Sequence, residues 1–134
     1  MKSKVLVVND DRDSWRLLSR ILRSHDIDLV WAANGTQALA AARFHQPSAI
    51  LLDLGMPGAD GLVVLERLKS NPVLSHIPVI VVTVRNRQEA EKETRRLGAV
   101  GYVSKPIQAN ALIASLRAVL PSDRPPDGGA ANAM

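Results

Sequence analysis

Five short apolar runs alternate with amphipathic segments along the chain. Each run has four or five consecutive apolar residues without polar alternation, which is typical of strands that a parallel sheet buries on both faces. The sequence therefore predicts five buried strands. They lie at residues 5–8, 29–33, 49–52, 79–82 and 100–103.

The segments between and after these runs carry apolar residues at helical spacing. In the first, Trp15, Leu18 and Leu22 share one face, with Arg16 and Arg20 on the other. Three later segments show the same spacing, and the third helix should begin near Gly61 and end near Asn71 and Pro72. Their predicted inward positions are Ala38, Leu39 and Ala42, then Val64, Leu65 and Leu68, and finally Leu112, Leu116 and Val119.

The predicted fourth helix, residues 88–97, differs from the others. Its apolar stripe consists only of Ala90, Thr94 and Leu97, and most of its other residues are charged. A helix with so little apolar surface to bury should be held weakly and should move easily.

Strands and helices that alternate five times predict an α/β fold with right-handed crossovers and helices on both faces of a parallel sheet. The 134 residues are enough for one domain with a core. We assign residues 1–120 to this domain. From Pro121 the sequence loses both its apolar content and its periodicity, so residues 121–134 are predicted to be a disordered tail.

Polar side chains follow four of the five predicted strands. In an open parallel sheet, ligands bind beyond the carboxyl ends of the strands, where the strand order reverses. Asn9 and Asp10 follow the first run, Asp53 the third, Thr83 the fourth and Lys105 the fifth. If the strand order is 2-1-3-4-5, the first and third strands are neighbours at the reversal, and Asp10 faces Asp53.

Two facing carboxylates require a compensating charge. At about 4 Å they repel by roughly 4 kcal/mol at an effective dielectric near 20, so the fold must supply a cation or a proton. Hard oxygen ligands with open coordination positions suit Mg²⁺. With the Lys105 ammonium and the Thr83 hydroxyl added, the group fits an incoming phosphoryl group, for which an Asp can be the nucleophile.

Composition narrows the function classes. The absence of cysteine excludes a disulfide framework and a thiolate site, and it fits a reducing compartment. The aromatic content of 3% argues against a base-stacking surface, and the net charge of +4 is modest. The first apolar run stops at Asn9, too soon for a signal peptide or a membrane span. We therefore expect a cytoplasmic protein with neither direct nucleic-acid binding nor a membrane partner.

With these residues in place, the chain resembles the receiver domains of two-component response regulators, the flavodoxin-like group that includes the chemotaxis regulator. That group has the doubly wound (βα)5 fold with strand order 2-1-3-4-5. The resemblance covers about residues 4–120, in order and in spacing. The matching segments are VLVVNDD at 5–11, LLDLGMPGADG at 51–61, VIVVT at 79–83 and GAVGYVSKP at 98–106.

The resemblance implies that Asp53 is the phosphoacceptor and takes its phosphoryl group from a histidine kinase or a histidine phosphotransfer protein. It also implies that Mg²⁺ is held by Asp10, Asp53 and the backbone carbonyl of Gly55, beside Asn9. Thr83 and Lys105 would contact phosphoryl oxygens.

By the same resemblance, Tyr102 is the aromatic residue that moves inward as Thr83 is drawn toward the phosphate. The Lys105–Pro106 peptide bond would be cis. Such a protein is a conformational switch rather than an enzyme with a separate substrate, although it catalyses its own phosphoryl transfer and dephosphorylation.

Two positions depart from the family pattern. Asn9 replaces the usual first acidic residue, so we expect weaker Mg²⁺ binding than in a fully acidic site. Val84 replaces a small residue, and a β-branched side chain there should slow both phosphorylation and loss of phosphate. These departures keep open a degenerate receiver that binds partners without phosphorylation.

Two other protein classes are weighed against the receiver. A haloacid-dehalogenase-type phosphatase requires a second Asp two residues after its nucleophile, where this chain has Gly55. A flavin-binding flavodoxin requires a phosphate cradle where this chain has carboxylates.

Simpler structural roles remain for the individual residues. Asp10 and Asp11 can start the first helix by complementing its dipole, and we expect Asp11 or Asp13 to do so. Asp53 can end a turn, Lys105 can be a solvated loop lysine, and Tyr102 can fill the sheet. Thr83 is an ordinary strand residue when taken alone. Met56 and Pro57 form a predicted turn, Trp15 and Trp31 are assigned to packing, and the three histidines to the surface.

The partners remain open at this level. The arginines of the first helix are either a solvated face or a docking surface for the phosphodonor. The cognate kinase, the downstream target and the choice between a monomer and an activation-dependent dimer cannot be inferred. The chain is either a stand-alone regulator or part of a longer one.

Overall fold

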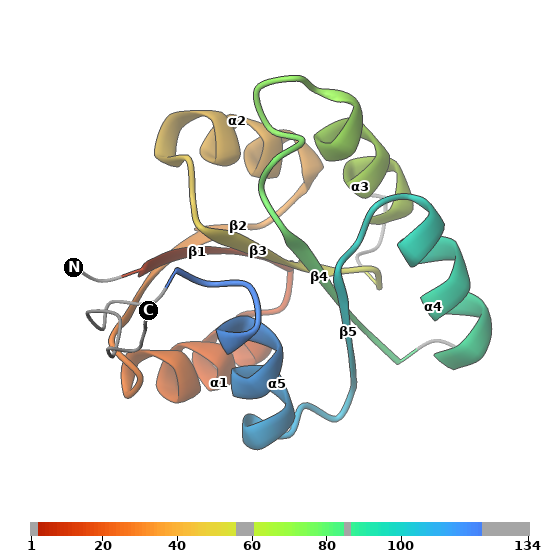
Figure 1. Ribbon diagram of the computed structural model, residues 1–134. Coiled ribbons are helices and arrows are strands. Elements are labelled where there is room, and N and C mark those ends of the chain that lie inside the picture. The colour runs from red at the N-terminus through yellow and green to blue at the C-terminus, as the bar shows by residue number, and fades with distance from the viewer. Residues whose placement is uncertain (1–2, 56–60, 85–86, 122–134) are drawn as a thin grey trace, which may run out of the picture.

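The computed structural model describes residues 3–55, 61–84 and 87–121, with the backbone alone for 87–90. Its centre is a five-stranded parallel sheet in the order β2-β1-β3-β4-β5, as predicted (Figure 1). The predicted tail, apart from Pro121, and the predicted turn at Met56 and Pro57 lie outside the described residues. The strands are β1 (Ser3–Val8), β2 (Ile27–Ala32), β3 (Ala49–Asp53), β4 (Val79–Thr83) and β5 (Gly101–Ser104).

Helices cover both faces of the sheet, which confirms the doubly wound class (Figure 1). On one face, α1 (Arg12–Arg23) and α5 (Ala109–Arg117) pack on a core that includes Leu18, Leu22, Leu112 and Leu116. On the other lie α2 (Gly35–His45), α3 (Gly61–Ser70) and α4 (Arg87–Arg96), over a second core. The two cores contain the predicted inward residues of all five helices except Ala90, whose side chain is not described, and Thr94, which is buried outside them.

Burial follows the position of each strand in the sheet. All residues of β3 and β4 are buried, as are the last four of β1. The edge strands β2 and β5 are partly exposed, since each has a neighbour on one side only. The prediction of burial on both faces was therefore correct for the three central strands and too strong for the two edge strands.

Side-chain caps fix where two of the helices begin. Asp11 is the N-cap of α1 and accepts hydrogen bonds from Asp13 N at 3.1 Å and Ser14 Oγ at 2.9 Å. These bonds favour the ionised carboxylate, and they lower the pKa of Asp11 below its ordinary value. Asn34 caps α2 in the same way, through Gln37 N at 2.9 Å. The predicted helix-starting role of Asp11 is thus confirmed.

The described part of α4 agrees with the prediction of a thin apolar stripe. Of its residues 91–96, only Thr94 is buried, and Leu97, just past the helix, is partly buried. Glu91 and Arg95 form an exposed ion pair at 3.1 Å on this helix. Little apolar surface therefore holds α4 against the sheet.

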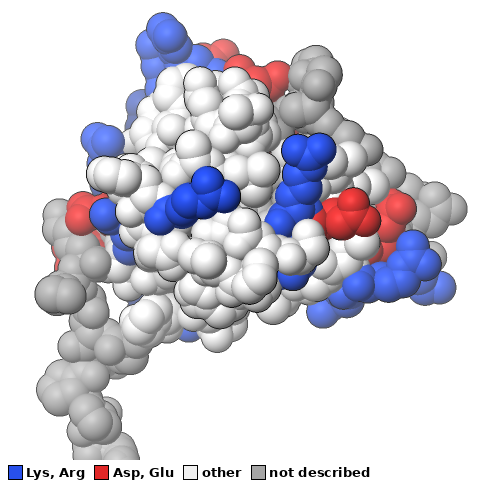
Figure 2. All heavy atoms as spheres, turned by 90° about the horizontal axis from the view of Figure 1, so that it is seen from above, with Lys and Arg blue, Asp and Glu red and all other residues white. Residues whose placement is uncertain are grey.

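The helices and the surface charge are relevant to membrane and nucleic-acid partners. Across the described part of the chain, no helix has the length and apolar character needed to cross a membrane. On the face that Figure 2 shows, most surface atoms belong to uncharged residues, and the coloured Lys and Arg side chains stand apart or beside acidic ones. That face has no continuous basic surface among its described residues.

Candidate functional site

Asp53 is the last residue of β3, and the strand order places it between the ends of β1 and β4. Its side chain is only 8% exposed, yet both carboxylate oxygens have donors. Oδ2 accepts from Lys105 Nζ at 2.8 Å, and Oδ1 accepts from the Gly55 backbone N–H at 2.7 Å. The burial cost of the carboxylate is therefore offset by one full charge and one peptide dipole.

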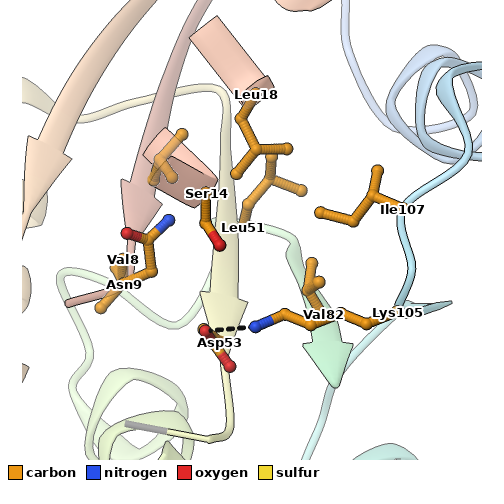
Figure 3. Close-up of a pocket in the computed structure, with 10 residues that line it drawn as sticks. Val8, Asn9, Ser14, Leu18, Leu51, Asp53, Val82, Lys105 and Ile107 are labelled. Carbon is orange, nitrogen blue, oxygen red and sulfur yellow. Dashed lines mark hydrogen bonds and ion pairs between the residues drawn. The ribbon is translucent and has the colours of Figure 1, made fainter. Parts of the chain in front are cut away.

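Lys105 reaches Asp53 from the segment that follows β5. Its backbone N–H donates to the carbonyl of Thr83 at 3.0 Å, so the ends of β4 and β5 stay together beyond the sheet. The Lys105–Pro106 bond is cis, as the resemblance implied. The side chain then extends across the end of the sheet to the carboxylate (Figure 3).

Asn9 follows β1 and is 2% exposed. Its backbone N–H donates to Ala32 O at 3.1 Å, and its carbonyl accepts from Trp31 Nε1 at 2.8 Å. Its side-chain Oδ1 accepts from Asp11 N at 3.2 Å. Asn9 is thus held firmly at the end of β1, next to Asp10.

Asn9, Asp53 and Lys105 line one pocket, with Asn9 on one side and Lys105 on the other (Figure 3). Ser14, from the first turns of α1, also lines it. The rest of the lining is apolar, so the charges of the site lie against a medium of low dielectric, where electrostatic interactions are strong. The apolar lining residues are Val7, Val8, Leu18, Leu51, Val82 and Ile107.

The other predicted site residues are not among the residues that line this pocket. Asp10 is exposed and follows Asn9 directly, and Gly55 is exposed, with its backbone N–H bonded to the Asp53 carboxylate. Thr83 is 1% exposed and pairs with Ser104 across the two strand ends. Tyr102 is partly buried against the core on the α2–α3 face. Asn9, Asp53 and Lys105 thus line the same pocket, and Lys105 and Gly55 both bond the Asp53 carboxylate.

Two contributions were missed from the sequence. Ser14 lines the pocket because it lies one helical turn before Leu18 on the inward face of α1, a spacing that could have indicated it. Trp31 was assigned to packing alone, yet its indole bonds the main chain of Asn9. No sequence signal indicates that second contact, because it depends on the register between β1 and β2.

The available donors suit a hard cation with few protein ligands. Asp10 and Asp53 would supply carboxylate oxygens, Asn9 an amide oxygen and Gly55 a carbonyl, which are the ligand types that Mg²⁺ prefers. Among the described residues, no three His, Cys, Asp or Glu side chains gather closely enough to hold a metal by themselves. These oxygen ligands therefore fit a Mg²⁺ ion that keeps several waters. The neutral amide of Asn9 stands where a third carboxylate would make the site more negative.

Comparison with known proteins covers nearly the whole chain. The family model of the response regulator receiver domain matches residues 5–117. The polar-differentiation response regulator DivK of Brucella anthropi is 33% identical over 120 residues, 90% of this chain and 98% of that protein. Protein PilH of Pseudomonas aeruginosa is 31% identical over 118 residues, 88% and 98% of the two chains.

Solved structures show the same fold. Chemotaxis response regulator CheY4 of Vibrio cholerae superposes with a TM-score of 0.82 at 27% identity, covering 90% of this chain and all of that one. A response regulator of Chloroflexus aurantiacus, described as putative, gives 0.84 at 25% identity, with 89% and 98% covered. With the family model, the relatives and the strand order in agreement, this chain belongs to the family of response regulator receiver domains.

Proposed function

We propose that this receiver domain accepts a phosphoryl group on Asp53 and responds as a Mg²⁺-dependent conformational switch. The observation that supports it most strongly is the pair of Asp53 and Lys105 at 2.8 Å, which lines a largely apolar pocket at the carboxyl end of the sheet. Receiver domains as a family are regulatory modules that interact with histidine kinases and with downstream targets.

The chemistry assigned to the residues follows from their positions. A carboxylate oxygen of Asp53 attacks the phosphorus of a phosphohistidine, the P–N bond breaks, and an acyl phosphate forms on Asp53. The Lys105 ammonium, 2.8 Å from Oδ2 before transfer, stabilises the negative charge on the transferred group. The apolar lining keeps these charges in a medium of low dielectric.

Asp10, Asp53 and the carbonyl of Gly55 would hold a Mg²⁺ ion, with Asn9 beside them. When bound, the ion would supply a second positive charge against the negative charge of the transferred group. Receiver domains in general bind Mg²⁺ at their acidic pocket.

The switch is proposed to run from Thr83 to Tyr102. Thr83 ends β4 one strand away from Asp53, and Tyr102 lies on β5, the edge strand next to it. A phosphoryl oxygen accepts a hydrogen bond from the Thr83 hydroxyl, which shifts the partly buried Tyr102 and the weakly packed α4. A full shift from 1:99 to 99:1 takes about 5.5 kcal/mol, within reach of two or three charge-assisted hydrogen bonds of about 1.5–3 kcal/mol each.

The test is incubation with a small-molecule phosphodonor and Mg²⁺, read by intact mass. We expect one added phosphoryl group in the wild type, none in Asp53→Ala, and one in the control Asp28→Asn, which removes an exposed carboxylate from β2. Addition that persists in Asp53→Ala would contradict the assignment.

The second candidate is a receiver that binds its partners without phosphorylation. The amide of Asn9 in the pocket favours it, because the site has one carboxylate fewer to attract a cation. No added mass with any donor, together with normal folding, would support this candidate over the first.

A further inference from the structure

The turn that follows β1 is held from the edge strand β2 by an indole. Trp31 Nε1 donates to the carbonyl of Asn9 at 2.8 Å, and the next residue, Ala32, accepts the Asn9 backbone N–H at 3.1 Å. The Asn9 side chain accepts from Asp11 N at 3.2 Å. The backbone N–H, the backbone carbonyl and the side-chain Oδ1 of Asn9 therefore all have partners, and two of these partners are residues of β2.

The bond to the Asn9 carbonyl bears directly on Asp10. The carbonyl of Asn9 and the backbone N–H of Asp10 belong to one planar peptide unit. When Trp31 fixes the direction of that carbonyl, it also fixes the plane from which the Asp10 backbone starts. Asp10 is the exposed carboxylate that the proposed function assigns to Mg²⁺.

The indole is itself held in place by a second one. Trp15 of α1 stacks on Trp31, with ring centroids 5.4 Å apart and planes at 9°. The backbone N–H of Trp15 in turn donates to Asp11 O at 3.0 Å. Asn9, Trp31, Trp15 and Asp11 thus form a closed ring of contacts, and Asp10 lies between two of its members, Asn9 and Asp11.

Packing alone does not account for this arrangement. A partly buried indole usually has an acceptor for its N–H. The acceptor here is the carbonyl of Asn9, which lies just beyond the end of β1 and next to Asp10 of the proposed cation site. A phenylalanine would retain the aromatic stack on Trp15 without constraining the Asn9 carbonyl.

We propose that Trp31 is a positioning residue for the cation site, because its indole N–H orients the Asn9–Asp10 peptide through the Asn9 carbonyl. The inference rests on the proposed Mg²⁺ site. It predicts that loss of the indole N–H weakens the affinity for Mg²⁺ more than loss of the neighbouring indole does.

The experiment is a Mg²⁺ titration followed by calorimetry and by the amide resonances of residues 9–11, on the wild type, Trp31→Phe and Trp15→Phe. Trp31→Phe should bind Mg²⁺ about tenfold more weakly, the low end of the cost of removing groups that orient metal ligands. Trp15→Phe keeps an aromatic ring against Trp31 and leaves the bond from Trp31 to Asn9 in place. This variant should change the affinity for Mg²⁺ less than twofold. Equal losses of affinity in the two variants would overturn the inference.

A measurement on the wild type alone covers the case in which Trp31→Phe does not fold. The indole N–H of Trp31 donates to the Asn9 carbonyl, so Mg²⁺ should shift its resonance more than that of the Trp15 indole N–H. If the wild type binds Mg²⁺ and neither resonance moves, the inference about Trp31 fails while the cation site stands. If the wild type binds no Mg²⁺ near Asp10, the cation site and the inference fail together.

Discussion

Lys105 Nζ lies 2.8 Å from Asp53 Oδ2, although the two residues are 52 positions apart in the sequence. The lysine side chain is 25% exposed and the carboxylate 8% exposed, so the pair is largely removed from water. The carboxylate thus has its counter-charge within the protein. A cation that enters the site meets an Asp53 that is already neutralised in part.

Lys105→Met should lower the free energy of unfolding by about 3 kcal/mol, because it leaves the buried Asp53 carboxylate with a neutral donor only. The same variant should gain more stability from added Mg²⁺ than the wild type does, since the repulsion between the ammonium and the metal is gone. Urea unfolding with and without Mg²⁺ measures both effects.

The control for that experiment is Lys69→Met. Lys69 donates to Ser75 O at 3.1 Å and to Ile77 O at 2.7 Å, and burial lowers the pKa of its ammonium. Its loss removes a partly buried lysine that bonds the segment before β4 rather than Asp53. An equal gain from Mg²⁺ in both variants would show that Lys105 has no special relation to the cation.

Asn9→Asp should bind Mg²⁺ more tightly, by about tenfold, because a second carboxylate faces the pocket that Asp53 lines. Its oxygen can still accept the Asp11 N–H, so the turn should be retained. Asn34→Asp is the matched control, since Asn34 makes the same kind of bond to Gln37 N at the start of α2. Equal affinity in Asn9→Asp and the wild type would remove the argument that the amide weakens the site.

Val84→Ala should speed both phosphorylation and loss of phosphate if the β-branched side chain narrows access to Asp53. Val84 directly follows Thr83 and is 72% exposed, so the substitution should cost little stability. Val100→Ala, at a valine 48% exposed just before β5, is the control. Intact mass against time measures both rates, and unchanged rates in Val84→Ala would reject the effect.

Charge reversal on α1 tests the docking of the phosphodonor. Arg16 and Arg20 are exposed beside Leu17, itself 44% exposed, on the outer face of the helix. Arg16→Glu with Arg20→Glu should slow transfer from a phosphorylated protein donor at least tenfold and leave a small-molecule donor unaffected.

The matched control for α1 reverses Arg43 and Arg67, exposed arginines on α2 and α3. Slowing with both kinds of donor would place the α1 effect in the site rather than in docking. No slowing with either donor would leave the arginines as a solvated face.

The sequence predicted the fold well because the apolar runs of the central strands are unambiguous. The prediction was weaker at the ends of the strands. The first strand begins at Ser3 rather than Val5, the second at Ile27 rather than Leu29, and the fifth spans Gly101–Ser104, one residue later than predicted. Polar residues at the ends of a strand still pair in the sheet, so an apolar run does not mark where the pairing begins or stops.

For the site, the residue after each strand was the useful signal, since parallel strands end at one edge of the sheet. That signal predicted that Asn9, Asp53 and Lys105 lie close together, and in the structure all three line one pocket. It gave no information on which contacts form between side chains and main chain. The bond from Trp31 to Asn9 and the bond from Gly55 to Asp53 depend on register and turn geometry.

The strand order also sets when the pocket can exist during synthesis. Its lining draws on residues from position 7 near the start to position 107 in the loop before the last helix. A ribosome-bound chain that has not yet released β5 has Asp53 but not its lysine. If Asp53 is the phosphoacceptor, as proposed, the domain should remain unresponsive to phosphodonors until nearly all of residues 7–107 have emerged.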